Sequence, residues 1–325
     1  MDDAALSQRM ERYRREIVLH CYRMLGAGPD AEDATQDALL KAWQARESLR
    51  GESALRAWLY RIATNVCLDL LERRGPRVLP HLAFPPADAG TPPRPFLESA
   101  IWVGPFPDDA SSPDAAHERA ERVTLAFVAA LQHLPARQRA ALLLRDVVEL
   151  SAHEAADVLA TTPGAVEAAL QRARTTIEAR RDRAPEMAAR TDVRDLLERY
   201  VSAWQSRDAS AFVSLLAEDA SFVMPPTPVW FHGKDAVGRF VGARLAEHAW
   251  RLVATSANGL PAFGLYRADP SGGWIAHGIQ ALELSGSTVK TIHTFLVMSD
   301  PRLFATFGLP ARLDDTSETK SAATV

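Results

Sequence analysis

Apolar residues recur at helical spacing over most of the first 75 positions. Between Ser53 and Arg74 they stand at positions 55, 59, 62, 66 and 70, which form one stripe along a helix. Asp30 follows Pro29, and Asp33 stands three residues later, a spacing that resembles a capping box. The pattern predicts helices almost throughout residues 4–74, with Asp30 as the cap of one of them.

A second helical block covers residues 117–183, with breaks at Pro135 and near 161–163. Ser151 and Glu154 have the spacing of a capping box, which predicts a helix that closes at Val158 and Leu159. A turn of three residues, 160–162, follows this helix.

The next helix of that block has its own start signals. Thr162 is placed to cap it and Pro163 occupies its first position. Its expected buried stripe consists of Val166, Ala169 or Leu170, Ala173 and Ile177. Two short helices joined by a tight turn favour a helix-turn-helix, although an ordinary helical hairpin would give the same local pattern.

The pattern changes again after residue 185. Apolar positions predict a helix over 191–206 and a shorter one over 208–217. Runs typical of strands follow, separated by Gly, Asn, Pro and Ser: "ASFVM", "RLVATSANGLPAFGLYR", "GGWIAHGIQALEL" and "TVKTIHTFLVM". Helices followed by a meander of strands predict an α+β domain over 190–315, with a disordered tail at 316–325.

Between the two helical blocks lies a segment rich in proline. Residues 81–116 contain one basic residue against five acidic ones. Prolines prevent regular structure over most of this stretch, so we expect an extended acidic linker over 76–116.

Composition and charge give no sign of a strongly basic nucleic-acid binder, a disulfide-rich protein or a membrane protein. The net charge of −4 does not indicate a nucleic-acid binder, so any DNA contact has to come from local faces of the molecule. Cys21 and Cys67 both lie in helical patterns and are expected to be buried, reduced thiols. The polar N-terminus and the absence of a long apolar run predict a cytoplasmic protein without a signal peptide or a membrane span.

Two blocks of sequence, taken together, resemble a known family. "DAEDATQDALLKAWQARESLRGESALRAWLYRIATNVCLDLLERR" looks like region 2 of bacterial RNA polymerase sigma factors of the extracytoplasmic-function (ECF) type. "HLPARQRAALLLRDVVELSAHEAADVLATTPGAVEAALQRARTTI" resembles their region 4. The resemblance implies a multidomain chain with two all-α sigma domains, a region 2 helical bundle at 1–75 and a region 4 helix-turn-helix at 117–184. It also implies that the chain binds core RNA polymerase and directs transcription from specific promoters.

The family assigns region 2 two surfaces. Asp33, Gln36 and Asp37 match the surface that docks on the coiled coil of the largest polymerase subunit. The loop around residues 46–56 matches the one that captures a flipped base of the −10 element, and a separated strand is bound through aromatic and basic side chains. The expected −10 residues are Arg50, Glu52, Ser53, Tyr60, Arg61 and Asn65.

The family places the −35 element on the second helix of region 4, and the polymerase flap is a further expected partner. The expected −35 residues are Thr162, Gly164, Ala165, Glu167, Ala168, Gln171, Arg172 and Arg174. Where relatives often carry "TVKSRL", this chain has "AVEAAL", which removes three possible DNA partners. Glu167 can accept from a cytosine amino group but repels phosphate.

The region after residue 190 resembles the start of SnoaL-like domains, in which a curved sheet forms a cone with helices. Such a cone implies a pocket for a small molecule, and its expected lining includes Trp204, Met224, Trp230, His232 and His293. The histidines lack metal-ligand spacing and no aspartate clearly pairs with them, so we expect no metal, cofactor or catalysis. The interpretation is therefore a sigma factor regulated by its own SnoaL-like domain. The alternative is a small-molecule sensor or enzyme tethered to a DNA-binding module.

Overall fold

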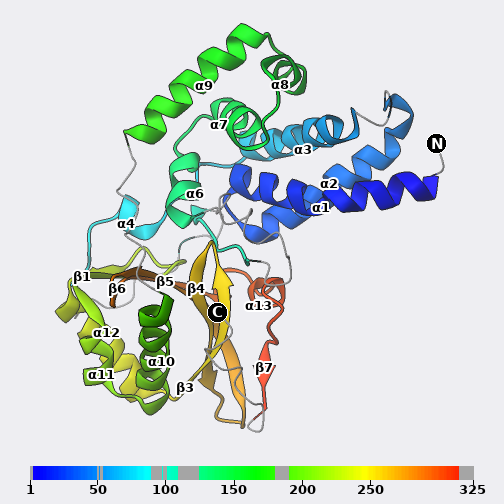
Figure 1. The fold of residues 1–325 in the computed structure, drawn as a ribbon. Coiled ribbons are helices and arrows are strands. Elements are labelled where there is room, and N and C mark those ends of the chain that lie inside the picture. The colour runs from blue at the N-terminus through cyan, green and yellow to red at the C-terminus, as the bar shows by residue number, and fades with distance from the viewer. Residues whose placement is uncertain are drawn as a thin grey trace. The chain divides into compact units, whose positions relative to one another are not determined.

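The computed structural model describes residues 3–49, 51, 54–88, 97, 101–108, 124–179 and 190–314. The chain divides into two units, which Figure 1 shows as a helical part and a part built on a sheet. The first unit comprises residues 1–77 and 125–182, and the second comprises residues 78–124 and 183–325. Both predicted helical blocks therefore belong to one unit.

The first block forms a bundle of three long helices. These are α1 (Asp3–Leu25), α2 (Gly28–Gln44) and α3 (Leu55–Glu72), with the short 3-10 helix η1 (Arg46–Ser48) after α2. Cys21 and Cys67 are both free and fully buried, as the sequence predicts. The prediction that Asp30 caps a helix is wrong, because α2 already begins at Gly28. The Asp30 carboxylate instead pairs with Arg74 and Arg77 beyond the end of α3.

The second block contains the helix-turn-helix. Its elements are α6 (Leu125–Gln132), α7 (Ala136–Leu142), the π-helical turn η4 (Leu143–Val147), α8 (Ala152–Leu159) and α9 (Pro163–Glu178). The predicted capping box is confirmed, since Ser151 Oγ accepts from Glu154 N at 3.2 Å and Ser151 N donates to the Glu154 carboxylate at 2.8 Å. Thr162 Oγ1 accepts from Ala165 N at 3.2 Å, so the predicted cap of α9 is also confirmed.

The second unit is an α+β domain. Its helices are α4 (Pro80–Ala83), α10 (Arg190–Ser206), α11 (Ala209–Ser214), α12 (Lys234–Glu247), the 3-10 helix η5 (Val297–Ser299) and α13 (Leu303–Thr306). Its strands are β1 (Leu216–Val223), β2 (Trp230–His232), β3 (Trp250–Ala257), β4 (Leu260–Ala268), β5 (Trp274–Ser285), β6 (Thr288–Leu296) and β7 (Arg312–Leu313). The predicted meander is confirmed for β3 to β6.

The sheet has the order β2-β1-β6-β5-β4-β3, and β7 pairs with β5. Its pairs are antiparallel except β1 and β6, which run parallel. Sequence reasoning did not predict the three-residue strand β2 or the helix α12. The chain turns between them at Gly233, whose φ of 88° suits glycine.

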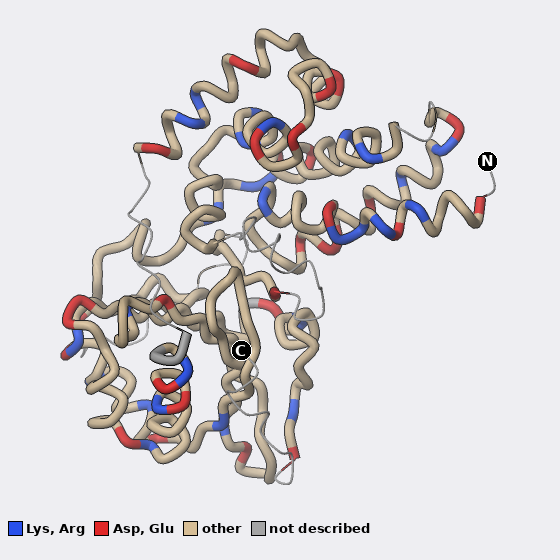
Figure 2. The backbone as a smooth tube through the Cα atoms, in the orientation of Figure 1, with Lys and Arg blue, Asp and Glu red and all other residues tan. Residues whose placement is uncertain are grey.

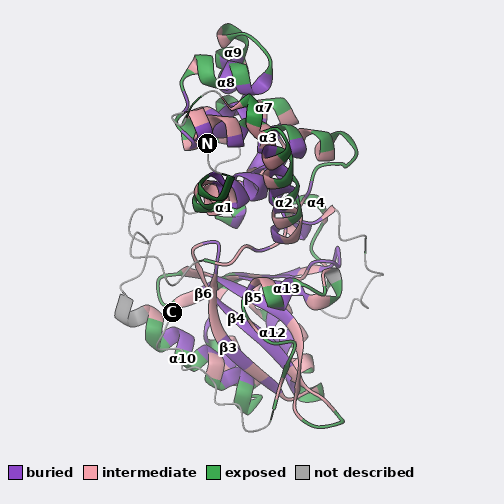
Figure 3. Ribbon diagram, turned by 90° about the vertical axis from the view of Figure 1, so that its right-hand side faces the viewer, coloured by how far each residue is buried: buried purple, intermediate pink, exposed green. Residues whose placement is uncertain are grey.

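One face of this sheet, which we call the inner face, forms the core of the domain with α10, α11 and α12. Tyr200 and Trp204 of α10 pack there with side chains from alternate strand positions such as Phe222, Phe231 and Ile292. Buried positions along the strands are purple in Figure 3. The buried Tyr200 hydroxyl donates to Gln280 Oε1 at 2.7 Å, and Gln280 Nε2 donates to Thr294 Oγ1 at 3.1 Å. These bonds satisfy the polar groups that the inner face buries.

The opposite face, which we call the outer face, carries the intervening residues of the same strands. Val223 pairs with Trp230 on one side and with His293 on the other, so all three point to that face. Residues 78–88 and 101–108 of the proline-rich segment bind along this part of the unit. The ring of His81 lies 6.1 Å from that of Trp230 and 5.9 Å from that of His293. The segment is therefore attached to the sheet, where the sequence predicts an extended linker.

The attachment reaches both edges of the sheet. At the β2 edge, Trp230 Nε1 donates to Phe84 O, and Ala87 N donates to Trp230 O, each at 2.8 Å. At the other edge, beside the turn from β3 to β4, Phe106 N donates to Asn258 Oδ1 at 2.8 Å. The Asp108 carboxylate accepts from Gly259 N at 2.8 and 3.0 Å. Main-chain groups of Phe84, Ala87 and Phe106, with the His81 ring and the Asp108 carboxylate, provide this attachment, which proline content alone does not predict.

Candidate nucleic-acid interface

The three residues expected to contact the polymerase lie together on α2. Asp33, Gln36 and Asp37 are exposed and stand one turn apart on the face that points away from α1 and α3. Leu40 continues this face and is 55% exposed. Among the large apolar residues that the structure describes, only Met298 is more exposed. Sequence reasoning missed Leu40, although an apolar residue one turn beyond an acidic pair was visible in the sequence. Exposed apolar groups beside charges are typical of protein-binding surfaces.

The residues expected to contact the −10 element are only partly brought together. Arg61 and Asn65 are exposed and lie one turn apart on α3. Arg50, Glu52 and Ser53 lie outside the described residues. Of the residues predicted to contact the −10 element, the structure therefore places Arg61 and Asn65 together at the surface of α3.

The expectation that Tyr60 offers its ring at the surface is wrong for this conformation. Tyr60 is 4% exposed, and its hydroxyl donates to Glu16 Oε2 at 3.2 Å. Arg56 lies over its ring at 5.2 Å and pairs with the same carboxylate at 2.9 Å, while His20 meets the ring edge-on. Burial and the Glu16 carboxylate raise the pKa of Tyr60, so the hydroxyl stays a donor. Tyr60 joins α3 to α1 through this bond, and its ring is buried.

The second helix of the helix-turn-helix presents a face of small residues. Val166, Leu170 and Ala173 are buried, as the stripe predicts. The exposed positions on the other side include Gly164, Ala165, Ala168, Gln171 and Arg172. A helix with so little side-chain bulk at its first two turns is able to approach base edges closely.

Charged residues at one border of α9 are paired within the unit. Arg145 of η4 donates to Glu167 Oε1 through Nε at 3.2 Å and approaches it through Nη2 at 3.1 Å. Its Nη1 also donates to Leu150 O. Arg174 holds Asp146 with two hydrogen bonds of 2.9 and 2.6 Å. Glu167 and Arg174, both expected to meet DNA, therefore face η4; Figure 2 shows charges of both signs along α9.

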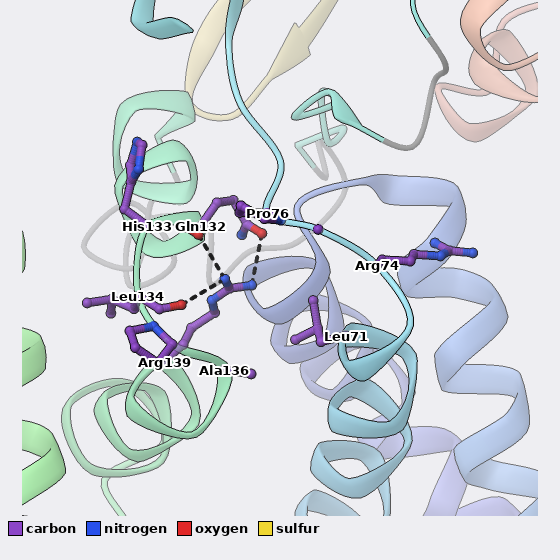
Figure 4. A pocket seen from close by; sticks show the side chains of 10 residues that line it. Leu71, Arg74, Pro76, Gln132, His133, Leu134, Ala136 and Arg139 are labelled. Carbon is purple, nitrogen blue, oxygen red and sulfur yellow. Dashed lines mark hydrogen bonds between the residues drawn. The ribbon is translucent and has the colours of Figure 1, made fainter.

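A cavity of about 350 Å³ that is partly open to solvent lies on the first unit, where the end of α3 meets the junction of α6 and α7. It is lined by Leu71, Arg74, Gly75, Pro76, Gln132, His133, Leu134, Pro135, Ala136 and Arg139. Figure 4 shows the Arg139 guanidinium between Gln132 and Leu134. Arg139 is 2% exposed, and burial lowers the pKa of its guanidinium to about 10, so it remains a cation at neutral pH.

Arg139 joins the two helical blocks. Its Nη1 donates to Met24 O in the last turn of α1 and to Gln132 Oε1 at 2.8 Å. Its Nη2 donates to Gln132 O and Leu134 O at 3.2 Å each. Carbonyls at the ends of α1 and α6 carry the negative ends of the helix dipoles, which favours a cation there. All four of these hydrogen bonds go to carbonyl or amide oxygens and none goes to a carboxylate.

The five residues expected to line a pocket of the second unit do not gather. Trp204 is buried in the inner core and Met224 packs against that core. Trp230 and His293 point to the outer face with the bound segment, and His232 Nδ1 is 3.1 Å from Ser221 Oγ near the same face. Alternation along the strands separates the two groups, because successive side chains of a strand point to opposite faces.

The outer face contains a histidine–carboxylate pair. His293 Nε2 lies 3.0 Å from Glu283 Oε1. Burial by itself would raise the pKa of Glu283, but His293, Thr291 and His81 outweigh it and lower the pKa to about 2. Glu283 is therefore a carboxylate at neutral pH, and it fixes His293 under His81. Among the described residues, no group of three His, Cys, Asp or Glu side chains is arranged to hold a metal ion.

The described helices include none with the length and apolar character needed to cross a bilayer.

Three family models match successive parts of the chain. Sigma-70 region 2 matches residues 10–77, sigma-70 region 4 matches residues 124–177, and the SnoaL-like domain matches residues 197–289. The region 4 model covers the helix-turn-helix, and the SnoaL-like model runs from within α10 to the first two residues of β6.

Relatives of known identity agree with these matches. The ECF RNA polymerase sigma factor SigG of Mycobacterium tuberculosis is 40% identical over 94% of this chain and 84% of its own length. The RNA polymerase sigma-H factor of Pseudomonas aeruginosa is 31% identical over 54% of this chain and 86% of its own. The crystal structure of the M. tuberculosis sigma factor SigJ shares the fold, with a TM-score of 0.57 and 23% identity over 94% of this chain and all of that one. The chain belongs to the ECF RNA polymerase sigma factors, with a SnoaL-like domain fused after region 4.

Proposed function

We propose that this sigma factor is governed by its own SnoaL-like domain, which holds the linker between regions 2 and 4. The chain binds core RNA polymerase and directs initiation at specific promoters, as its family does. The observation that carries the regulatory proposal is the linker bound to both edges of the SnoaL-like sheet.

For region 2, the proposal assigns the exposed face of α2 to core polymerase. Asp33, Gln36 and Asp37 are the contacts, and Leu40 joins them because its apolar side chain is exposed on the same face. Arg61 and Asn65 on α3 contact the −10 strand, together with the loop residues Arg50, Glu52 and Ser53. For region 4, α9 contacts the −35 element with its exposed face.

Reversing charge on α2 tests the polymerase contact. We expect the double variant Asp33→Lys, Asp37→Lys to bind core polymerase at least roughly 5- to 30-fold more weakly, because two surface pairs of about 0.5–1 kcal/mol each are lost and repulsion adds to that loss. Affinity measured by fluorescence anisotropy checks it, with the Asp195→Lys, Glu198→Lys variant on the exposed face of α10 as control. Equal affinity of the two double variants would remove this face of α2 from the interface.

The regulatory proposal follows from the distance between promoter elements. Elements centred at −10 and −35 lie roughly 85 Å apart along B-DNA at about 3.4 Å per base pair. In the structure, α3 packs against α8, and Arg56 Nη1 donates to Val148 O at 3.2 Å, so both DNA-reading regions belong to one unit. Reading both elements at once requires these regions to separate and the linker to extend. A linker attached to the SnoaL-like sheet opposes that extension.

Deleting residues 190–325 tests whether the domain acts on initiation. The first unit has its own core, and we expect the shortened chain to form open complexes with core polymerase at least ten-fold faster than the full chain, because the linker has lost all of its attachment. In vitro transcription from a promoter library measures the effect. Equal promoter output and equal core affinity of both chains would refute regulation by the domain.

We propose no catalytic role for the SnoaL-like domain. A histidine–carboxylate pair is the kind of group that does acid–base work, but His293 and Glu283 lie on the outer face against His81 of the linker. On the inner face, Tyr200, Gln280 and Thr294 bond to one another. This arrangement supports a docking role for the pair. Turnover of a small molecule without polymerase would support the alternative of an enzyme tethered to a DNA-binding module.

A further inference from the structure

We propose that Gln171 selects an adenine in the −35 element, and that Glu167 is a positioning residue that fixes Arg145 beside it. The inference rests on the proposed −35 role of α9. It assigns the base selection of region 4 to one side chain, and it gives the unusual acidic residue of α9 a function other than reading a base.

The assignment of Gln171 follows from the hydrogen bonds of α9. The Thr162 hydroxyl is used by the cap, and the Thr175 and Thr176 hydroxyls donate to Gln171 O and Arg172 O. Glu167 and Arg174 are held in ion pairs. In the part of α9 before Glu178, this leaves Gln171 and Arg172 as the exposed side chains whose hydrogen-bonding groups have no partner among the described residues.

The surroundings of Gln171 suit contact with a base. Gly164 and Ala168 stand seven and three residues before it, on the same exposed side of the helix. Their small size lets the helix enter the major groove deeply enough for a residue in its third turn to reach a base edge. A glutamine amide pairs with adenine in a bidentate manner, accepting from N6 and donating to N7. The geometry therefore favours adenine opposite Gln171.

The Glu167 carboxylate is turned toward Arg145 through one of its oxygens. Its Oε1 accepts two contacts from Arg145, and the same guanidinium donates to Leu150 O. Arg145 is thereby held from two sides, next to α9, while its side chain is 26% exposed. A fixed guanidinium at the border of a recognition helix is suited to a DNA phosphate. Glu167 acts on DNA through Arg145.

The experiment uses the full chain with core polymerase and a promoter library randomised over the −35 element. We expect the wild-type protein to prefer adenine at one position, with a discrimination of roughly 5- to 150-fold. Gln171→Ala loses the preference at that position alone. Gln171→Glu changes it to cytosine, since a carboxylate accepts from the cytosine N4 amino group. Gln205→Ala, the same change on the exposed side of α10, keeps the wild-type preferences.

The role of Glu167 is tested by a double-mutant cycle. We expect Arg145→Met to lower the slope of log affinity against log salt concentration by about one, without changing any base preference. Glu167→Gln is expected to weaken binding in the same direction, and to have no further effect in the Arg145→Met background. Additive losses, or a changed base preference in Glu167→Gln, would overturn the positioning role.

Failure of this inference differs from failure of the proposed function. A wild-type protein with −10 preference and no −35 preference would refute the role of α9 in reading the −35 element. A wild-type −35 preference that Gln171→Ala leaves intact at every position would overturn the assignment of Gln171, while the role of α9 would stand.

Discussion

Replacing Arg139 by methionine is expected to lower the free energy of unfolding of the first unit by about 3–5 kcal/mol, because several buried acceptors lose their donor at about 1–3 kcal/mol each. The guanidinium donates four hydrogen bonds, and three of their acceptors are main-chain carbonyls of Met24, Gln132 and Leu134. Methionine fills much of the same volume but donates nothing, so these carbonyls and the Gln132 amide lose their partner in a buried place.

Urea denaturation followed by far-ultraviolet circular dichroism measures the change, and hydrogen exchange locates it. Amides at the ends of α1 and α6 are expected to lose protection first, because Arg139 bonds to both ends. Arg73→Met, the same substitution at an exposed position after α3, is expected to change stability by less than about 0.5 kcal/mol. A loss below about 1 kcal/mol in Arg139→Met would mean that water replaces the guanidinium through the adjoining cavity.

Features fixed by neighbouring residues could be predicted from the sequence. Ser151 and Glu154 are three residues apart, and so are Thr162 and Ala165, so the caps of α8 and α9 depend on local hydrogen bonds alone. The buried stripe of α9 and the meander β3 to β6 follow from periodicity in the same way. The two sigma domains were predicted from the resemblance of two sequence blocks to region 2 and region 4, since the local pattern alone left an ordinary helical hairpin open.

Features fixed by distant partners could not be predicted. Asp30 looked like a cap, but Arg74 and Arg77 lie 44 and 47 residues later and take its carboxylate. Tyr60 looked exposed, but Glu16 of α1 accepts its hydroxyl. His293 looked like a pocket residue, and only the pairing of β6 with β1 and β5 turns it to the outer face. In each case the deciding interaction joins elements whose order in space the sequence does not state.

The attachment of the linker is the other such feature, and its release is expected to have the largest effect on function. The double variant Trp230→Ala, Asp108→Ala removes the Trp230 side chain that bonds to Phe84 O and contacts His81, and the carboxylate that accepts from Gly259 N. These groups anchor the two ends of the bound segment. Each 1.4 kcal/mol taken from the attached state raises the released fraction about ten-fold while that state predominates.

We therefore expect the double variant to form open complexes with core polymerase at least ten-fold faster than the wild-type chain, and to expose residues 78–88 and 101–108 to hydrogen exchange. Leu82→Ala changes a residue of α4 that is 48% exposed, and it serves as the matched control with wild-type rates. Each measurement constrains the other. Faster exchange in the linker with an unchanged rate of open-complex formation would show that attachment does not limit initiation. The linker would then be released without any gain in rate. A faster rate without faster exchange would contradict the proposal that release of the linker speeds initiation, because the segment would still be attached.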